Sequence, residues 1–137
     1  MTLTLRNDIQ DVPLLAAFMD EVCEAAGFNA SLAMQMNLAM EEAVVNVMNY
    51  AYPVGVKGDI VIEAEDKGDS VQFDIIDGGT PFDPTAEADV DTTLSAEERP
   101  IGGLGIFLVR QLMDIVSYKY KDGKNRLTLV KKKVKSK

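Results

Sequence analysis

The sequence contains no histidine and a single cysteine, Cys23, among its 137 residues. Without histidine the chain cannot form a His-based metal site, a Ser-His-Asp triad or a phosphohistidine relay, and one cysteine cannot form an internal disulfide. No apolar run approaches the roughly 18 residues that a membrane span requires, and residues 1–10 lack the basic end and apolar core of a signal peptide. We therefore expect a cytoplasmic protein outside the membrane, with Cys23 and the seven methionines in its core.

Positive charge is scarce in the body of the chain and concentrated at its end. The formal net charge is −8, but residues 119–137 hold nine of the 14 Lys and Arg and only one acid, Asp122. The acidic body that precedes them would repel a polynucleotide, which binds mainly through its phosphates, so we expect no direct contact with nucleic acid. We interpret the basic tail, residues 131–137, as a solvated terminus.

The length is close to that of one domain, and 47% hydrophobic residues suffice for one core, so residues 1–137 are treated as a single domain. Periodicity of two predicts strands and periodicity near 3.6 predicts helices. In chain order the pattern predicts a strand at 2–6, a helix from Asp11 or Pro13 to the cap Gly27, and a second helix capped by Asn29 or Ser31 and ended by Pro53. A hairpin within 57–75 follows, turned at 67–69, and then a lid over 78–102. A third helix opened by 102–105 precedes a last hairpin of 115–120 and 126–130, turned at Asp122 and Gly123.

Helices and hairpins are segregated along the chain rather than alternating singly. This order predicts an α+β fold, a two-layer α/β sandwich with a mostly antiparallel sheet, and it argues against a doubly wound fold.

Two polar side chains lie in an otherwise apolar stretch of the second predicted helix. Glu42 and Asn46 are four residues apart, so both leave the same face of the helix. A carboxylate can orient a hydroxyl or accept its proton, and an amide oxygen is a ligand that Mg²⁺ takes alongside phosphate oxygens. Taken alone, the spacing is more typical of an ordinary Glu–Asn hydrogen bond on a solvated helix face.

An acidic residue closes the predicted strand before the lid. Asp77 begins the segment Asp-Gly-Gly-Thr-Pro-Phe-Asp-Pro, residues 77–84. An ionised carboxylate only accepts hydrogen bonds, so Asp77 can hold the amino group of adenine, and the glycines beside it let the backbone approach a flat ring. Asp-Gly-Gly also terminates strands for conformational reasons, so a turn is the simpler interpretation of this segment by itself.

Glycines also mark the far end of the lid. Gly102, Gly103, Leu104 and Gly105 open the third predicted helix, where free backbone N–H groups and the helix dipole favour an anion. A flexible hinge for the lid is the alternative. The usual phosphate motifs do not fit, because no Gly-Lys-Ser/Thr follows and Leu108 stands where a dinucleotide fingerprint has its third glycine.

In combination, these segments resemble the N box (residues 42–46) and the two glycine boxes (77–84 and 102–106) of the gyrase and histidine-kinase type ATPase superfamily. Within it the chain most resembles the small bacterial anti-sigma-factor serine/threonine kinases, because Glu-Ala-Val-x-Asn and Pro-Phe-Asp-Pro are specific for that branch. The resemblance covers nearly the whole chain. It implies the Bergerat ATP-binding fold, with helices on one face of the sheet and a long ATP lid over 78–102.

The resemblance also implies a role for each matching residue. Glu42 would be the general base, Asn46 the Mg²⁺ ligand and Asp77 the adenine contact. The implied nucleotide-binding set also includes Gly79, Pro81, Arg99, Gly102, Gly103, Leu104 and Gly105.

Three positions depart from the family pattern. Arg99, the lid's basic residue, is shifted in register relative to the arginine that relatives often carry near the triphosphate. Residues 123–125 are Gly-Lys-Asn, whereas family members tend to have a Gly-Thr pair there, whose hydroxyl helps to hold the adenine contact. Tyr50 stands where a histidine is common.

The function that the resemblance implies is a cytosolic kinase that uses ATP and Mg²⁺ to phosphorylate a serine or threonine of a partner. The implied substrate is a small anti-anti-sigma (STAS-type) protein, the other client is a sigma factor, and kinases of this branch act as homodimers. Two alternatives remain: an ATP-binding module that switches partners without phosphotransfer, and a detached histidine-kinase catalytic domain. The intact Glu42 favours the kinase over the first, and the absence of histidine means that the second could not supply its own phosphoacceptor.

Overall fold

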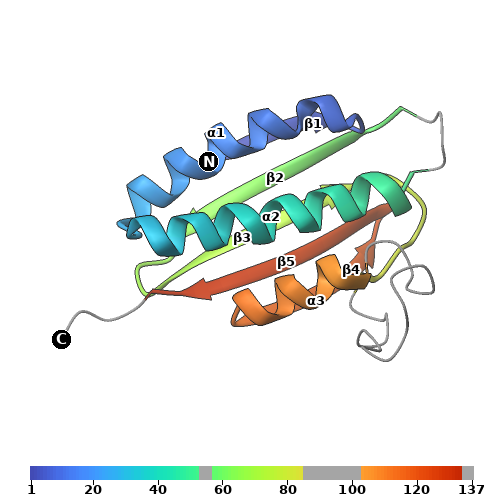
Figure 1. The fold of residues 1–137 in the computed structure, drawn as a ribbon. Coiled ribbons are helices and arrows are strands. Elements are labelled where there is room, and N and C mark those ends of the chain that lie inside the picture. Colours follow the sequence, from blue (N-terminus) through green and yellow to red (C-terminus); the bar gives the residue numbers. More distant parts are fainter. Residues whose placement is uncertain (53–56, 85–102, 134–137) are drawn as a thin grey trace.

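The computed structural model describes residues 1–52, 57–84 and 103–133, and in these residues three helices lie on one face of a five-stranded sheet (Figure 1). Every neighbouring pair in the strand order β1-β2-β3-β5-β4 is antiparallel, which confirms the predicted α+β sandwich. The elements in chain order are β1 (Thr2–Arg6), the 3-10 turn η1 (Ile9–Asp11), α1 (Val12–Ala26), α2 (Ala30–Tyr50), β2 (Asp59–Asp66), β3 (Ser70–Asp77), α3 (Gly103–Leu112), β4 (Ile115–Lys121) and β5 (Lys124–Lys132).

The helix boundaries follow from local chemistry. Asn29 accepts a hydrogen bond from the Leu32 N–H at 2.8 Å, so Asn29 rather than Ser31 caps α2. Gly27 ends α1 in the left-handed conformation, with φ of 79°. Asp11 precedes α1 as predicted, but its carboxylate binds the guanidinium of Arg6 at 2.8 Å instead of capping the helix.

Turn chemistry sets the register of the last hairpin. Asp122 and Gly123 connect β4 to β5 with φ of 55° and 75°, the two positive values that a type I′ turn requires. This turn pairs Tyr120 with Asn125 and, through the ladder between β3 and β5, places Asn125 opposite Asp77.

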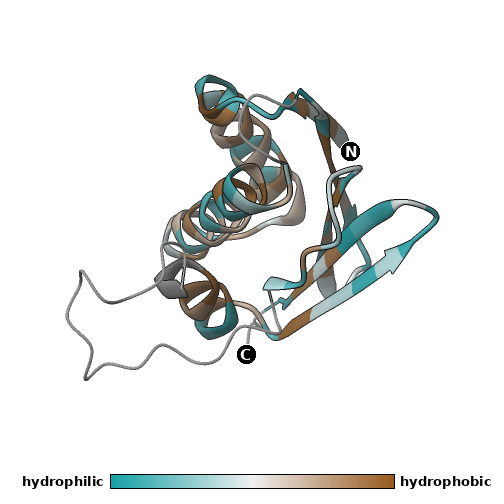
Figure 2. Cartoon of the chain, turned by 90° about the vertical axis from the view of Figure 1, so that its right-hand side faces the viewer, coloured by the Kyte–Doolittle hydropathy of each residue, from teal (hydrophilic) through white to brown (hydrophobic). Residues whose placement is uncertain are grey.

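Alternation along the strands gives the sheet one buried face, which the helices cover (Figure 2). Phe73, Ile75 and Leu129 are at most 1% exposed on that face, and Cys23 of α1 is equally buried, as predicted. The prediction that all seven methionines lie in the core is wrong for Met1 and Met34, which are 51% and 72% exposed. None of the described helices is both long and apolar enough to cross a membrane.

The predicted basic tail begins inside the sheet rather than beyond it. Strand β5 runs to Lys132, which pairs with Ser70 of β3. The ammonium of Lys131 donates to the Leu112 carbonyl at 3.0 Å, and the ammonium of Lys133 binds Asp66 at 2.9 Å. The interpretation of residues 131–133 as a solvated end is therefore wrong, because ladder and side-chain contacts hold them; residues 134–137 lie outside the described part.

Candidate functional site

The elements that carry the predicted site residues meet at one end of the domain. The last turn of α2, the end of β3 and the first turn of α3 lie at the right in Figure 1, and α2 packs against α3. The backbone N–H and the hydroxyl of Thr80 both donate to the Ala51 carbonyl, at 2.8 and 3.0 Å. The rings of Tyr50 and Phe82 stack with their centroids 5.4 Å apart. These contacts join the segment after Asp77 to the helix that carries Glu42 and Asn46.

Helix α2 holds Glu42 and Asn46 one turn apart on one face, as predicted. Glu42 is partly buried, whereas Asn46 is only 6% exposed. Within the described residues, no hydrogen bond is recorded for the Asn46 amide, and neither its oxygen nor its nitrogen is among the fully buried polar atoms that lack a partner. Its oxygen is therefore available as a ligand atom.

The carboxylates near the site do not assemble into a metal centre of their own. The described part of the chain contains no group of three or more His, Cys, Asp or Glu side chains arranged to hold a metal ion. If Asn46 holds a divalent cation here, as the sequence predicts, its amide oxygen would be a protein donor beside oxygens of phosphate or water. Mg²⁺ tolerates such a donor set, because it is commonly bound through few protein groups and substrate phosphates.

Asp77 lies at the end of β3 on the helix-covered face and is 3% exposed. Its Oδ1 accepts hydrogen bonds from the Gly79 N–H at 2.8 Å and from Asn125 Nδ2 at 2.9 Å. No donor to Oδ2 is recorded among the described residues. Burial raises the pKa of the Asp77 carboxyl, and the hydrogen bonds from Asn125 and Gly79 oppose that rise. A carboxylate held at one oxygen and open at the other can accept a hydrogen bond from a ligand.

Asn125 is a site residue to which the sequence analysis assigned no role. It is 3% exposed in β5, directly opposite Asp77 in the ladder. Its amide also donates to the Thr80 carbonyl at 2.8 Å and accepts from the Phe82 N–H at 3.1 Å and from the Tyr118 hydroxyl. Asn125 thus supplies an amide N–H to Asp77 at the hairpin end where the family's Gly-Thr pair would supply a hydroxyl. The sequence did carry one signal for this residue. Asn125 is two and four residues before the apolar Leu127 and Leu129, so a strand places all three on the same buried face.

The two glycines after Asp77 have different surroundings. An added Cβ at Gly79 would lie 2.2 Å from the Ala51 carbonyl oxygen, so only glycine fits against the end of α2. An added Cβ at Gly78 would meet only the Tyr52 hydroxyl, at 3.9 Å. That hydroxyl accepts a hydrogen bond from the Gly78 N–H at 2.9 Å and donates to the Asp59 carbonyl at 2.8 Å. Packing alone thus accounts for Gly79, and its place beside a purine stays a prediction.

The remaining predicted residues divide between the described and undescribed parts of the chain. Pro81 is exposed in the segment after β3, and Gly103, Leu104 and Gly105 form the first turn of α3, as predicted. The first N–H groups of a helix have no hydrogen-bond partner within the helix, so they can bind an anion such as phosphate. Arg99, Gly102 and the rest of the predicted lid from residue 85 onward lie outside the described residues.

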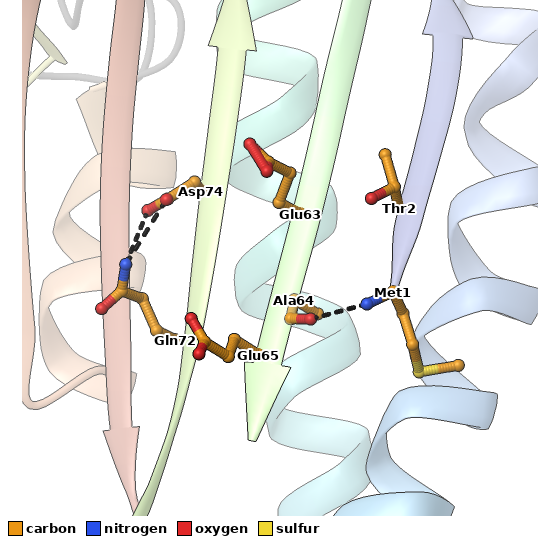
Figure 3. Close-up of a pocket in the computed structure, with 7 residues that line it drawn as sticks. All are labelled: Met1, Thr2, Glu63, Ala64, Glu65, Gln72 and Asp74. Atoms are coloured by element: carbon orange, nitrogen blue, oxygen red, sulfur yellow. Dashed lines mark hydrogen bonds between the residues drawn. The ribbon is translucent and has the colours of Figure 1, made fainter. Parts of the chain in front are cut away.

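A separate hollow lies on the other face of the sheet (Figure 3). Asp74 and Asp77 both belong to β3 but point to opposite faces, because they are three residues apart on a strand. The hollow is therefore distinct from the site around Asp77. It measures about 250 Å³ and is lined by Met1, Thr2, Glu63, Ala64, Glu65, Gln72 and Asp74.

Residues 5–131 match the family model of the histidine kinase-like ATPase domain. The serine-protein kinase RsbW of Listeria monocytogenes serovar 1/2a is 31% identical over 127 residues, which cover 90% of this chain and 81% of the relative. The serine/threonine-protein kinase BtrW of Bordetella bronchiseptica is 30% identical over 102 residues, which cover 74% of this chain and 72% of the relative.

Two solved structures share the fold. The crystal structure of the RsbU and RsbW domains of a Mycobacterium tuberculosis protein aligns with a TM-score of 0.62 and 16% identity, covering 96% of this chain and 32% of the other. The histidine kinase domain of an Erythrobacter litoralis blue-light activated kinase aligns with a TM-score of 0.52 and 13% identity, covering 88% and 60%. This chain thus spans less than two thirds of either solved chain, and at such identities the likeness concerns the fold alone.

Proposed function

The chain belongs to the histidine kinase-like ATPase domain family, and from this premise we propose that it is a protein serine/threonine kinase that binds ATP and Mg²⁺ around Asp77 and Asn46. One observation carries the proposal: among the described residues the buried carboxylate of Asp77 has donors at Oδ1 and none recorded at Oδ2, and the segment after it is bonded through Thr80 to Ala51 at the end of α2, the helix that carries Glu42 and Asn46. The sequence relatives support the kinase reading, because their names are those of serine or serine/threonine protein kinases.

The proposed mechanism is mainly one of positioning. Oδ2 of Asp77 accepts a hydrogen bond from the adenine amino group, and the N–H groups of the first turn of α3 bind phosphate oxygens. Asn46 offers its amide oxygen to Mg²⁺, which when bound offsets the negative charge of the phosphates. Glu42, one turn earlier on the same face of α2, orients the acceptor hydroxyl and takes its proton.

We further propose a small anti-anti-sigma (STAS-type) protein as the phosphoacceptor, a sigma factor as the second client, and the cytoplasm as the location. The support is the sequence resemblance to the anti-sigma-factor kinases, together with the match over most of the length of serine-protein kinase RsbW. The competing proposal, an ATP-binding module that switches partners without phosphotransfer, would use the same site without Glu42.

The kinase proposal is tested with labelled nucleotide. The chain is incubated with γ-labelled ATP, Mg²⁺ and a candidate acceptor protein, and transferred label is counted alongside ATP affinity. Glu42→Gln is expected to keep its ATP affinity and lose phosphotransfer by about a hundredfold or more. Glu41→Gln, a change at the exposed neighbouring acid, serves as the matched control and is expected to keep both.

The assay distinguishes the kinase from the ATP-binding module and tests the role of Glu42. Measurable ATP binding without any transferred label would favour the binding module over the kinase. A near-normal transfer rate in Glu42→Gln would remove Glu42 from the role of base while leaving the kinase in place.

We also propose that the chain forms a homodimer, and the open face of the sheet, opposite the helices, supports this proposal. Acids of β2 and β3 occupy one half of this face and bases of β4 and β5 the other, and at their boundary Arg126 already pairs within the chain with Asp74 at 2.6 Å and Glu63 at 3.7 Å. The basic half surrounds a hollow of about 230 Å³ lined by Ile76, Lys119, Lys121, Asp122, Lys124 and Arg126. Two copies related by a twofold axis can place each acidic half against the partner's basic half.

Such a dimer would depend on ionic strength. Sedimentation is expected to show a dimer at low salt whose dissociation constant rises with salt, because exposed charge pairs are screened. Lys119→Glu should weaken the dimer, whereas Lys57→Glu, at an exposed lysine outside the sheet, should not. A salt-independent monomer would refute this interface.

A further inference from the structure

One side-chain amide, that of Asn125, contacts four groups around the proposed base-binding carboxylate. Nδ2 of Asn125 donates to Asp77 Oδ1 at 2.9 Å and to the Thr80 carbonyl at 2.8 Å. Oδ1 of Asn125 accepts from the Phe82 N–H at 3.1 Å and from the Tyr118 hydroxyl. An amide has two N–H donors and two acceptor lone pairs, so these four contacts use its full capacity.

This arrangement fixes the amide in one orientation. Half a turn about its axis would direct its oxygen at the Asp77 carboxylate and the Thr80 carbonyl, and its NH₂ at the Phe82 N–H. Favourable contacts would then become acceptor–acceptor and donor–donor contacts in a site that is only 3% exposed. The amide therefore holds Asp77 Oδ1 with a defined geometry.

Tyr118 supplies the contact that can be altered without changing Asp77 or the loop. Its ring lies on β4, and the other partners of Asn125 are the carboxylate itself and two backbone groups. Burial raises the pKa of the Tyr118 hydroxyl, so the hydroxyl keeps its proton and remains a donor at neutral pH.

We infer that Tyr118 is a positioning residue for recognition of the nucleotide base, because its hydroxyl holds the oxygen of Asn125 so that the nitrogen holds Oδ1 of Asp77 and leaves Oδ2 for the ligand. The inference rests on the proposed function, in which Oδ2 accepts a hydrogen bond from the adenine amino group. Tyr118 acts through Asn125 and Asp77.

The network also restricts which base the carboxylate accepts. Oδ2 of the ionised Asp77 carboxylate is an acceptor only, and Asn125, whose two donors are already used, offers the base no donor beside it. A base that carries an amino group at that edge is bound, whereas one that carries a carbonyl oxygen there meets acceptor against acceptor. ITP is the matched probe, since it has a carbonyl where ATP has the amino group. Loosening Asp77 should weaken ATP more than ITP.

The test removes one oxygen atom from the network. Tyr118→Phe keeps the ring and loses the hydroxyl. Tyr120→Phe is the matched control, because Tyr120 lies two residues along the same strand, is 45% exposed, and its hydroxyl has no hydrogen bond recorded among the described residues. Calorimetry gives the dissociation constants for ATP and ITP with Mg²⁺, steady-state kinetics gives KM and kcat, and thermal unfolding reports on the fold.

In Tyr118→Phe we expect ATP affinity to fall about fivefold, with ITP affinity changed less than twofold, KM for ATP raised in proportion and kcat unchanged. Tyr120→Phe should match the wild type in all of these. Asn125→Ala removes the amide and breaks the same link one step nearer to Asp77 without putting a hydroxyl in its place, so it should also lower the preference for ATP over ITP.

The outcomes separate the inference from the proposal beneath it. A wild-type chain that binds no ATP at millimolar Mg²⁺ refutes the proposed function itself. A wild type that prefers ATP, with the same preference in Tyr118→Phe, overturns the inference alone. Equal losses for ATP and ITP would show a merely structural role and also overturn it. If Tyr118→Phe does not fold, an unchanged preference in Asn125→Ala overturns the inference.

Discussion

Replacement of Gly79 by alanine tests how tightly the segment after β3 packs on the end of α2. The added Cβ would lie 2.2 Å from the carbonyl oxygen and 2.7 Å from the carbonyl carbon of Ala51. Both are backbone atoms and cannot rotate away as a flexible side chain would. The loop and the helix end must therefore separate by about 1 Å to reach ordinary contact distance.

The cost of that separation follows from two effects. Overpacking in a well-packed region costs about 1–3 kcal/mol. The same movement stretches the two hydrogen bonds from Thr80 to the Ala51 carbonyl, now 2.8 and 3.0 Å. Each contributes about 0.5–1.5 kcal/mol. We expect Gly79→Ala to lower the free energy of unfolding by about 2–6 kcal/mol, which for a domain of this size lowers the melting temperature by about 7–20 °C.

The assay is thermal and urea unfolding without nucleotide, at one protein concentration. Gly78→Ala is the matched control, because its Cβ would meet only the Tyr52 hydroxyl at 3.9 Å, and it should change stability by less than about 1 kcal/mol. The reasoning fails if the two variants unfold within 1 kcal/mol of each other. Normal stability with lost ATP affinity in Gly79→Ala would mean that the ligand, rather than α2, requires the glycine.

Two further predictions concern buried titratable groups. Burial raises the pKa of Asp77, so its charged form is less stable in the fold than in the unfolded chain, and native stability rises as the pH falls through the raised pKa. Asp77→Asn should therefore unfold at pH 7 no more easily than the wild type. Its ATP affinity, measured by calorimetry, should be at least about tenfold weaker, because an amide can present a donor where an acceptor is needed. Lower stability with intact affinity would contradict both roles of Asp77. Burial also raises the pKa of Cys23 from 9.0 to about 11. Between those pH values the unfolded chain loses the thiol proton first, so the free energy of unfolding should fall by up to about 1.4 kcal/mol per pH unit. In urea titrations at several pH values, Cys23→Ala should show a pH slope of this free energy that is smaller by that amount. Identical slopes would refute the raised pKa of Cys23.

Much of the fold could be predicted because its signals are local. Period-two alternation located β1 at its observed bounds, Asn29 and Gly27 marked helix ends, and Asp122 with Gly123 specified the last turn. The basic residues at 131–133 were misjudged for the same reason. Composition suggests a solvated tail, whereas a partner strand distant in the sequence continues the ladder there.

The candidate site shows the same division. The spacing of Glu42 and Asn46 and the motif that begins at Asp77 are visible in the chain, because helical periodicity and strand ends are properties of neighbouring residues. The hydrogen bond between Asp77 and Asn125, which are 48 residues apart, is not.

The sequence by itself determined the element order and the two-layer architecture, and it yielded a prediction of the residues for nucleotide chemistry, since these follow from local periodicity, turn chemistry and recognisable motifs. Only the tertiary structure decided that Asn125 and Tyr118 hold the carboxylate of Asp77, that the Ala51 carbonyl excludes a side chain at Gly79, and that acids and bases divide the open face. The physical reason is that these contacts join strands and helix ends through space, and their geometry exists only after the sheet has paired in one register.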